Sequence, residues 1–161
     1  MKQRRSRDNI HKTKRERCLC FEEMNDIVFF KIEELKEHEE IRPDYLEELK
    51  NEILSDGILK MPIAVDKNTG IILDGHHRLH ALKRIGCTKI PVVLVDYQSP
   101  NIKVVGWREG ESITKEIIID TALAGRRMPS KTSKHMVILD GEWKHISAIE
   151  MFINIPLEEL K

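Results

Sequence analysis

The chain has 161 residues, of which 40% are hydrophobic and 34% are charged, and its formal net charge is zero. This composition argues against a disordered chain and against a membrane protein, and the length suits one compact domain with a hydrophobic core. No apolar run approaches the roughly 20 residues that a membrane-spanning helix needs. A net charge of zero provides no overall attraction to nucleic acid. We therefore expect one domain at residues 27–161, after an N-terminal extension at residues 1–26.

The N-terminal extension is strongly basic. Residues 1–17 contain eight lysines and arginines, against only Asp8 and Glu16. Such a run is typical of a solvated, flexible extension, and an arm that contacts DNA is the alternative. The extension has no apolar stretch of the kind found in a secretory signal, so we expect a cytoplasmic protein.

Three cysteines, Cys18, Cys20 and Cys87, form an odd set. In a chain without an export signal, an odd number of cysteines predicts reduced thiols and argues against a disulfide framework. Cys18 and Cys20 could contribute to a metal site, but no second cysteine pair completes one.

Apolar runs separated by proline, glycine and polar residues predict the secondary structure of the first hundred residues. Pro43 and Asp44 suit the first turn of a helix, and Gly57 and Gly86 suit the ends of helices. The predicted elements are, in chain order, a strand at 27–32, a helix at 43–56, a β-hairpin with strands at 62–65 and 71–74, a helix at 76–85 and a strand at 91–96.

The remaining residues predict shorter elements. These are a short strand at 104–107, a helix at 114–123, a loop at 129–135 and a strand at 136–139. The pair Asp140-Gly141 is a turn signal. We expect the strand that precedes this turn to pair with residues 149–155.

A strand–glycine–helix junction is the most informative feature. The buried strand ends at Asp74, turns through Gly75 and continues as a helix. The first amides of a helix lack internal partners and attract anions, and His76, His77 and Arg78 add donors there. These residues predict a phosphate-binding site. Asp74 would bind a metal ion or handle a proton; the alternative is that it only caps the helix while the histidines lie on the surface.

The sequence Asp-Gly-His-His-Arg at 74–78, followed by Ile-Pro-Val-Val-Leu-Val-Asp at 90–96, resembles the core of ParB/sulfiredoxin-like proteins. The resemblance implies an α/β (α+β) fold with a small mixed sheet flanked by helices. Sulfiredoxins carry their catalytic cysteine at the position of His76, so sulfiredoxin chemistry is not expected. ParB-type proteins normally add a helix-turn-helix region and carry a more arginine-rich phosphate motif, and neither is evident here.

A segment around His38 resembles a Pro-His-Glu stretch of the archaeal free serine kinases, which belong to the same superfamily. In those kinases the glutamate after the histidine is the catalytic base, which implies this role for Glu39. A positioned carboxylate is what a serine hydroxyl needs, because it must lose its proton as the phosphoryl group arrives. From the residues alone, the alternative is a solvated acidic loop that includes Glu37 and Glu40.

A second segment, Pro-Ser-Lys-Thr-Ser-Lys-His at 129–135, resembles the loop with which the same kinases bind their amino acid. The resemblance implies substrate binding by four residues of this loop: Lys131, Thr132, Ser133 and His135. Trp107 aligns with a tryptophan that lines the substrate pocket in the family, and ordinary core packing is its alternative. The chain lacks the long insertion that these kinases carry between that tryptophan and the loop.

The resemblance implies a free L-serine kinase that transfers a phosphoryl group from ADP or ATP, with Mg²⁺, to the serine hydroxyl. The product would be O-phospho-L-serine, a precursor for cysteine. Glu39 and Asp74 would be catalytic, with Asp74 as the candidate Mg²⁺ ligand, and Gly75 to Arg78 would bind the nucleotide phosphates. Two alternatives stay open: a non-enzymatic, nucleotide-binding regulator that contacts DNA through residues 1–17, and a kinase for another small alcohol.

Overall fold

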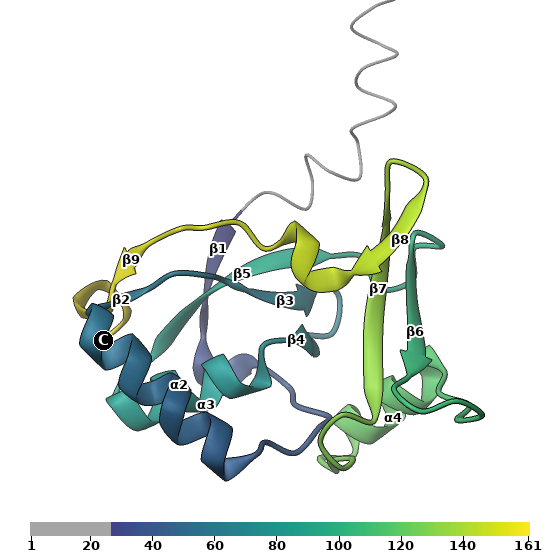
Figure 1. Cartoon of the computed structure of the whole chain (residues 1–161), viewed down its shortest axis with the longest axis horizontal. Coiled ribbons are helices and arrows are strands. Elements are labelled where there is room, and N and C mark those ends of the chain that lie inside the picture. Colours follow the sequence, from purple (N-terminus) through teal and green to yellow (C-terminus); the bar gives the residue numbers. More distant parts are fainter. Residues whose placement is uncertain (1–26) are drawn as a thin grey trace, which may run out of the picture.

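The structure, a computed structural model, describes residues 27–161. The predictions for the basic extension, including Cys18 and Cys20, lie outside the described residues, whereas Cys87 is a free, buried thiol. In chain order the elements are β1 (Ile27–Lys31), η1 (Ile32–Glu34), α2 (Pro43–Asp56), β2 (Ile58–Leu59), β3 (Ile63–Asp66), β4 (Ile72–Asp74), α3 (His76–Ile85), β5 (Lys89–Val95), β6 (Ile102–Gly106), α4 (Lys115–Leu123), β7 (Ser133–Leu139), β8 (Glu142–His145), η2 (Ile146–Ile149), β9 (Ile155–Pro156) and η3 (Leu157–Leu160), as Figure 1 shows.

A four-stranded mixed sheet with strand order β1-β5-β3-β4 forms the centre of the fold. β3 and β5 are parallel, while β1 and β4 run antiparallel to their neighbours. Asp66 fixes the turn between β3 and β4, because its Oδ2 accepts hydrogen bonds from the backbone N–H (3.1 Å) and the hydroxyl (2.6 Å) of Thr69. The predicted hairpin and the predicted small mixed sheet are both confirmed.

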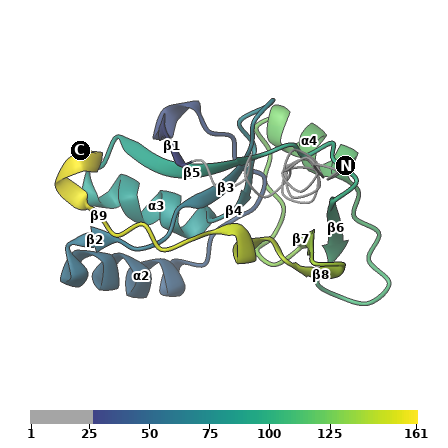
Figure 2. The ribbon, with the colours of Figure 1, turned by 90° about the horizontal axis from the view of Figure 1, so that it is seen from above.

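Alternate residues of the central strand β3 point into two separate cores. Ile63 and Val65 pack in the core with α2 and α3, whereas Ala64 packs in the other core with residues of β6, β7 and α4. This division follows from the two-residue period of a strand. Helices α2 and α3 contact each other and lie side by side along one face of the sheet (Figure 2).

The predicted helices are confirmed. α2 and α3 have the bounds that the sequence predicted, and Gly57 and Gly86 follow them in the left-handed conformation with φ of 68° and 96°. Such a conformation suits glycine, which closes the last turn through its own N–H. α4 begins one residue later than predicted, because Thr114 is its cap and accepts a hydrogen bond from the Ile117 N–H (3.2 Å).

The loop prediction for residues 129–135 is wrong in its second half, because β7 already begins at Ser133. Ser133, His135 and Val137 alternate as buried residues, and this is the period of a strand. The polar residue types conceal the strand in the sequence, since two of its inward-facing side chains are a serine and a histidine.

The predicted pairing of the strand at 136–139 with residues 149–155 is also wrong, because β7 pairs with β8. Asp140 and Gly141 have φ of 51° and 79°, and two successive positive values belong to a tight hairpin whose second strand follows at once. Ile149 instead ends η2 in the core, and Ile155 pairs with β2 in a separate two-stranded sheet. Within residues 27–161, no helix is long and apolar enough to cross a membrane.

Candidate active site

Gly75 makes the sharp turn between β4 and α3. Its φ is 109°, and a Cβ added there would lie 2.3 Å from Cγ2 of Ile63, so only glycine fits this close approach to β3. Gly75 is also the N-cap residue of α3 and provides no side-chain hydrogen bond to it. The first amides of α3 are therefore left for another partner, and such an arrangement attracts anions.

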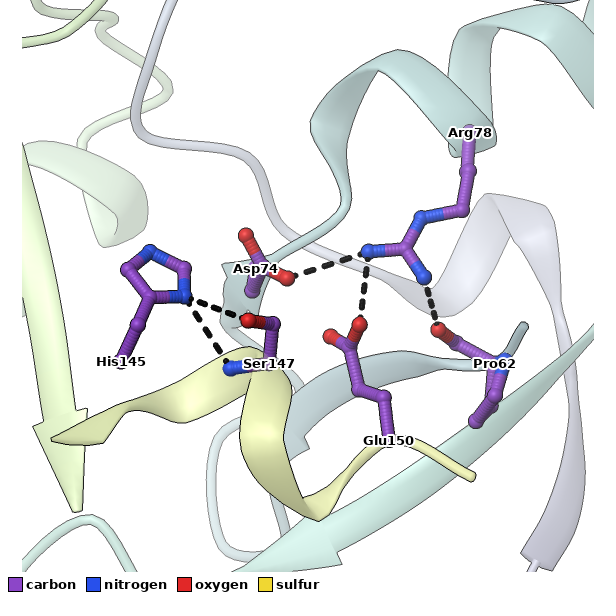
Figure 3. Close-up of polar contacts among 6 residues, drawn as sticks. All are labelled: Pro62, Asp74, Arg78, His145, Ser147 and Glu150. Atoms are coloured by element: carbon purple, nitrogen blue, oxygen red, sulfur yellow. Dashed lines mark hydrogen bonds and ion pairs between the residues drawn. The ribbon is translucent and has the colours of Figure 1, made fainter. Parts of the chain in front are cut away.

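Arg78 lies behind this turn, where three protein groups hold its guanidinium. Nη2 donates to Asp74 Oδ2 (3.0 Å) and to Glu150 Oε2 (2.9 Å), and Nη1 donates to the carbonyl oxygen of Pro62. Figure 3 shows these contacts converging on the one side chain. Arg78 is predicted as a phosphate ligand, but its guanidinium is already engaged with these protein groups.

The two histidines that open α3 accept hydrogen bonds from backbone amides. His76 Nε2 accepts from the His38 N–H (3.3 Å), and His77 Nε2 accepts from the Arg42 N–H (2.9 Å). Burial lowers the pKa of His77, and it lowers the pKa of His76 well below its ordinary value. Both rings are therefore neutral near pH 7 and carry their proton on Nδ1, so they act as hydrogen-bond donors and not as cations.

Glu39 lies where two distant segments meet. The Glu40 N–H donates to the Met128 carbonyl (2.8 Å), and the Met128 N–H donates to the His38 carbonyl (2.8 Å), so the two segments run side by side. Glu39 Oε2 accepts from the Ser133 hydroxyl (2.9 Å), and Oε1 accepts from the Lys131 N–H. Burial raises the pKa of Glu39 although these hydrogen bonds oppose the shift. A carboxylate in this setting is more basic than an exposed one.

Glu37 ties the segment that carries Glu39 to its neighbours. Its carboxylate contacts His80 of α3 and accepts from Arg127 Nη2 (2.8 Å), with Lys83 Nζ at 3.7 Å. The side chain is only 7% exposed. Glu37 is therefore an anchor that joins three parts of the chain, and the alternative of a freely solvated acidic loop does not hold for it.

Trp107 lies at the end of β6 with its ring at the surface. It is 48% exposed, so it is not a core residue. Its Nε1 donates to the Ser133 carbonyl (2.9 Å), and Lys134 Nζ lies 5.0 Å from the ring centroid. The indole is thus fixed against the first residue of β7, while about half of the side chain stays exposed.

The other loop residues differ in where they point. His135 is buried, and its Nε2 lies 2.8 Å from the Tyr97 hydroxyl; burial lowers its pKa to about 3. Lys131 is exposed and adopts a left-handed φ of 59°, which turns its N–H toward Glu39. Thr132 donates from its hydroxyl to the Pro129 carbonyl (2.5 Å), a hydrogen bond within the loop itself.

One pocket with a volume of about 570 Å³ joins these residues. This volume lies within the range of about 300–1,000 Å³ that is usual for small-molecule sites. Every predicted site residue except Thr132 lines the pocket: Glu39, Asp74, Gly75, His76, His77, Arg78, Trp107, Lys131, Ser133 and His135. Side chains from positions 39 to 135 therefore meet in one place.

Sequence reasoning missed part of the pocket wall. The remaining lining residues are Glu40, Arg42, Tyr45, Leu49, Met61, Leu73, Ser130 and His145. Tyr45 is 47% exposed and packs edge-on against the His77 ring, with centroids 4.8 Å apart. An exposed tyrosine in the first turn of a helix was the one available signal. Glu150, which reaches Arg78 from far along the chain, gave no local signal at all.

The described residues offer little of their own to a metal ion. Among residues 27–161, no three His, Cys, Asp or Glu side chains gather into a metal site. Asp74 is the one predicted ligand, and it lines the pocket with a side chain that is 26% exposed. A single carboxylate fits Mg²⁺ when most of the other ligands are nucleotide phosphates and water, which is how nucleotide-binding enzymes commonly hold this ion.

A family model described as the ParB N-terminal domain matches residues 20–109, which is more than half of the chain. The chain belongs to the ParB N-terminal domain family. This membership confirms the ParB-like fold inferred from the Asp-Gly-His-His-Arg motif, which lies inside the matched segment.

Curated relatives of this ParB N-terminal domain include L-serine kinases. An ATP-dependent L-serine kinase of Staphylothermus marinus is 39% identical over 84 residues, which cover 50% of this chain and 33% of that protein. An ADP-dependent L-serine kinase of Thermococcus kodakarensis is 34% identical over 86 residues, which cover 51% of this chain and 36% of that protein. The chain thus spans about a third of the length of the curated relatives it matches.

A solved structure extends the likeness beyond the matched segment. A free serine kinase in complex with AMP superposes with a TM-score of 0.70, covering 84% of this chain and 94% of that one. Its sequence identity is 19%, so the likeness establishes the fold of this ParB N-terminal domain and not its reaction.

Proposed function

We propose that the chain is a free L-serine kinase, which transfers a phosphoryl group from ADP or ATP to the serine hydroxyl. One observation carries the proposal: a partly buried carboxylate of raised pKa, Glu39, shares a pocket with the open N-terminus of α3. The two features supply a base for an alcohol and a cradle for phosphates, which are the parts that phosphoryl transfer needs. The kinase names of the relatives support the same assignment.

The donor phosphates would lie at the start of α3. Gly75 allows their close approach, and the first amides of the helix with His76 and His77 would donate hydrogen bonds to them. Because both imidazoles are neutral, they would orient the phosphates without neutralising them. We assign Arg78 a supporting role behind Asp74, since its guanidinium is already bound by protein groups.

Asp74 would hold a Mg²⁺ ion that arrives with the nucleotide, and the ion would offset the charge of the phosphates. The relatives carry both ATP-dependent and ADP-dependent names, so the donor is proposed as an adenine nucleotide of either kind. The pocket of about 570 Å³ is large enough to be shared by a nucleotide and an amino acid.

The acceptor serine would lie between Glu39 and the loop before β7. The Ser133 hydroxyl already donates to Glu39 Oε2, so this oxygen is accessible to a hydroxyl at hydrogen-bonding distance. Serine Oγ would attack the terminal phosphorus as the bond from that phosphorus to the leaving nucleotide breaks, and the hydroxyl proton would pass to Glu39. The products are O-phospho-L-serine and either AMP or ADP.

Recognition of the amino acid would fall to the loop and to Trp107. Lys131 brings a positive charge to the pocket for the serine carboxylate, while Ser133 and His135 line the wall beside it. Trp107, which is half-exposed in the pocket wall, would cover the substrate from the solvent side. Thr132 would act through the shape of the loop, since its hydroxyl is bonded to Pro129.

The test is an acceptor and donor panel with the purified chain. L-serine, L-threonine, L-homoserine and glycerol are each incubated with Mg²⁺ and ADP or ATP, and phosphorylated products are followed by ³¹P NMR. The proposal expects O-phosphoserine with at least one donor and a clear preference for L-serine. Preferential phosphorylation of another alcohol would replace serine as the substrate. Nucleotide binding without any phosphorylated product would reject kinase activity for this chain.

A further inference from the structure

Glu150 is buried at the phosphate-binding junction although it belongs to the far end of the chain. Its side chain is 1% exposed, and its Oε2 accepts from Arg78 Nη2 at 2.9 Å (Figure 3). The two residues are 72 positions apart in the sequence. A buried carboxyl group needs hydrogen-bond partners, so the contact with Arg78 is what allows Glu150 to be buried here.

The backbone around Glu150 holds the side chain firmly in place. Ile146 and Ile149 of η2 are fully buried in the second core, and the Glu150 N–H donates to the Ser147 carbonyl (3.0 Å). His145 precedes η2 and accepts from the Ser147 N–H (3.1 Å) through Nδ1 (Figure 3). η2 also contacts β4, the strand that ends at the junction. Glu150 therefore approaches Arg78 from a rigid support.

Arg78 passes this constraint on to Asp74. The two form an i,i+4 ion pair across Gly75, with 3.0 Å between Nη2 and Oδ2. Such a pair is weak when it is exposed, because long side chains lose entropy when they are held. Here the guanidinium is also fixed by Glu150 and by the Pro62 carbonyl, so most of that entropy is already lost.

We propose that Glu150 is a positioning residue of the phosphate-binding junction, which fixes the orientation of Asp74 through Arg78. We call the Glu150–Arg78–Asp74 contact the clamp. Its effect on the reaction rate rests on the proposed kinase function, whereas the clamp itself does not. The segment around residue 150 is therefore part of the active-site framework, although it lies outside the family-matched residues 20–109.

The matched variants are Glu150→Gln and Glu150→Met. Glutamine keeps the shape of the side chain and an oxygen that accepts from Arg78, while methionine fills a similar volume without such an acceptor. Glu142→Gln, in an exposed glutamate of β8, is the control for loss of a surface charge. Thermal unfolding establishes that each variant is folded before it is compared.

The first readout is the ¹⁵N NMR spectrum of the Arg78 guanidinium, assigned by its loss in Arg78→Met. The proposal expects separate, slowly exchanging Nη signals in the wild type and in Glu150→Gln, and their averaging in Glu150→Met. Unchanged signals in Glu150→Met would overturn the clamp. This measurement needs neither nucleotide nor serine, so it decides the inference even if the chain phosphorylates nothing.

The second readout is a double-mutant cycle on O-phosphoserine formation. Because misplacing a catalytic group by about 1 Å can cost up to about 100-fold, we expect kcat to fall about tenfold or more in Glu150→Met, with little change in the KM for serine. Glu150→Gln should stay within about threefold of the wild type. If Glu150 acts through Arg78, the double variant with Arg78→Met is no slower than Arg78→Met alone. Additive losses would contradict this route. Should Glu150→Met not fold, Glu150→Asp takes its place, because the shorter side chain withdraws the carboxyl group from Arg78. Unchanged guanidinium signals in Glu150→Asp would then overturn the clamp.

Discussion

Gly75 is the residue on which the geometry of the junction depends most directly. No side chain fits beside Ile63, because a Cβ on Gly75 would lie 2.3 Å from Cγ2. We predict that Gly75→Ala lowers the free energy of unfolding by about 1–3 kcal/mol, through backbone strain and this clash, and weakens nucleotide binding. Chemical denaturation and nucleotide titration measure the two effects.

Gly110→Ala is the matched control for Gly75→Ala. Gly110 also has a positive φ, of 82°, but nothing lies within 4 Å of an added Cβ. This variant should show only the cost of the backbone conformation and should bind nucleotide as the wild type does. Equal stability and equal nucleotide affinity in the two variants would contradict the close-approach argument.

The Ser133 hydroxyl reduces the basicity of Glu39. Its hydroxyl hydrogen bond to Oε2 favours the charged carboxylate and so lowers the pKa of Glu39, against the larger effect of burial. Removing the hydroxyl in Ser133→Ala should therefore raise this pKa. A hydrogen bond to a charged group contributes about 1.5–3 kcal/mol, so the acid limb of the kcat/KM profile should move up by about one to two pH units.

The pH–rate profile of Thr132→Ala provides the comparison for Ser133→Ala. The Thr132 hydroxyl is bonded to the Pro129 carbonyl and not to Glu39, so its removal should leave the acid limb where it is. An acid limb that stays fixed in Ser133→Ala as well would mean that Glu39 is not the group whose ionisation the profile reports.

The candidate active site depends on a tether between the segment that carries Glu39 and the residues before β7. Arg127 contributes to this tether, because its Nη2 donates a 2.8 Å hydrogen bond to Glu37. Because Arg127 is about half exposed, Arg127→Ala should cost less than about 1 kcal/mol of stability. The looser loop should raise the KM for serine about threefold to tenfold.

The nucleotide affinity of Arg127→Ala should stay unchanged, because Glu37 keeps its contacts with His80 and Lys83 and so still fixes its own segment against α3. Arg126→Ala, in the exposed neighbouring residue, is the control and should alter neither quantity. Isothermal titration with nucleotide and steady-state kinetics with serine separate the two effects. If Arg127→Ala also lost nucleotide affinity, the tether would support the nucleotide site as well as the serine site, contrary to this prediction.

Local signals in the sequence predicted the elements that short-range chemistry determines. The helices at 43–56 and 76–85 were predicted to the residue, because Pro43 and the glycines at 57 and 86 mark their ends. The strand β7 was missed at its start, since its buried residues there are a serine and a histidine. Burial of such polar groups depends on tertiary partners, as with the Tyr97 hydroxyl beside His135.

Some residues of the candidate site could likewise be predicted from local sequence signals, and others could not. Residues 74–78 could be recognised from one junction, and the pocket gathers them with Glu39 and the loop residues. Glu150 could not be found, because its partner Arg78 lies 72 positions earlier and no pattern in the sequence connects them. The sequence also could not show that Arg78 is bound by protein groups, because the residues around an arginine do not reveal whether its guanidinium is free.

Buried neutral histidines link the stability of the folded protein to pH. Burial lowers the pKa of His38 to about 4 and that of His135 to about 3, whereas unfolded histidines titrate near 6.5. Protons therefore bind more readily to the unfolded chain. The stability that these groups contribute is present above pH 6.5 and is lost as the pH falls through 4 toward 3.

Denaturation midpoints between pH 7 and pH 4, for the wild type and His135→Gln, measure this effect. Glu150 makes stability depend on pH in the opposite direction. Burial raises its pKa to about 9, so the stability that it contributes is present below the pKa of an unfolded glutamate and is lost as the pH rises through 9. Because both proteins contain Glu150, the difference in stability between the wild type and His135→Gln isolates the effect of His135. The wild type should lose more stability on acidification than His135→Gln, and equal losses would contradict a buried, neutral His135.

The proposed kinase function depends on Glu39 as the base in phosphoryl transfer to serine. The most direct measurement is the rate of O-phosphoserine formation by the wild type and by Glu39→Gln, with saturating L-serine, nucleotide and Mg²⁺. Glu33→Gln, in an exposed glutamate of η1, serves as the control. We predict that kcat falls by about 10²–10⁴-fold in Glu39→Gln while nucleotide affinity is unchanged. A Glu39→Gln variant that forms O-phosphoserine at the rate of the wild type would contradict it.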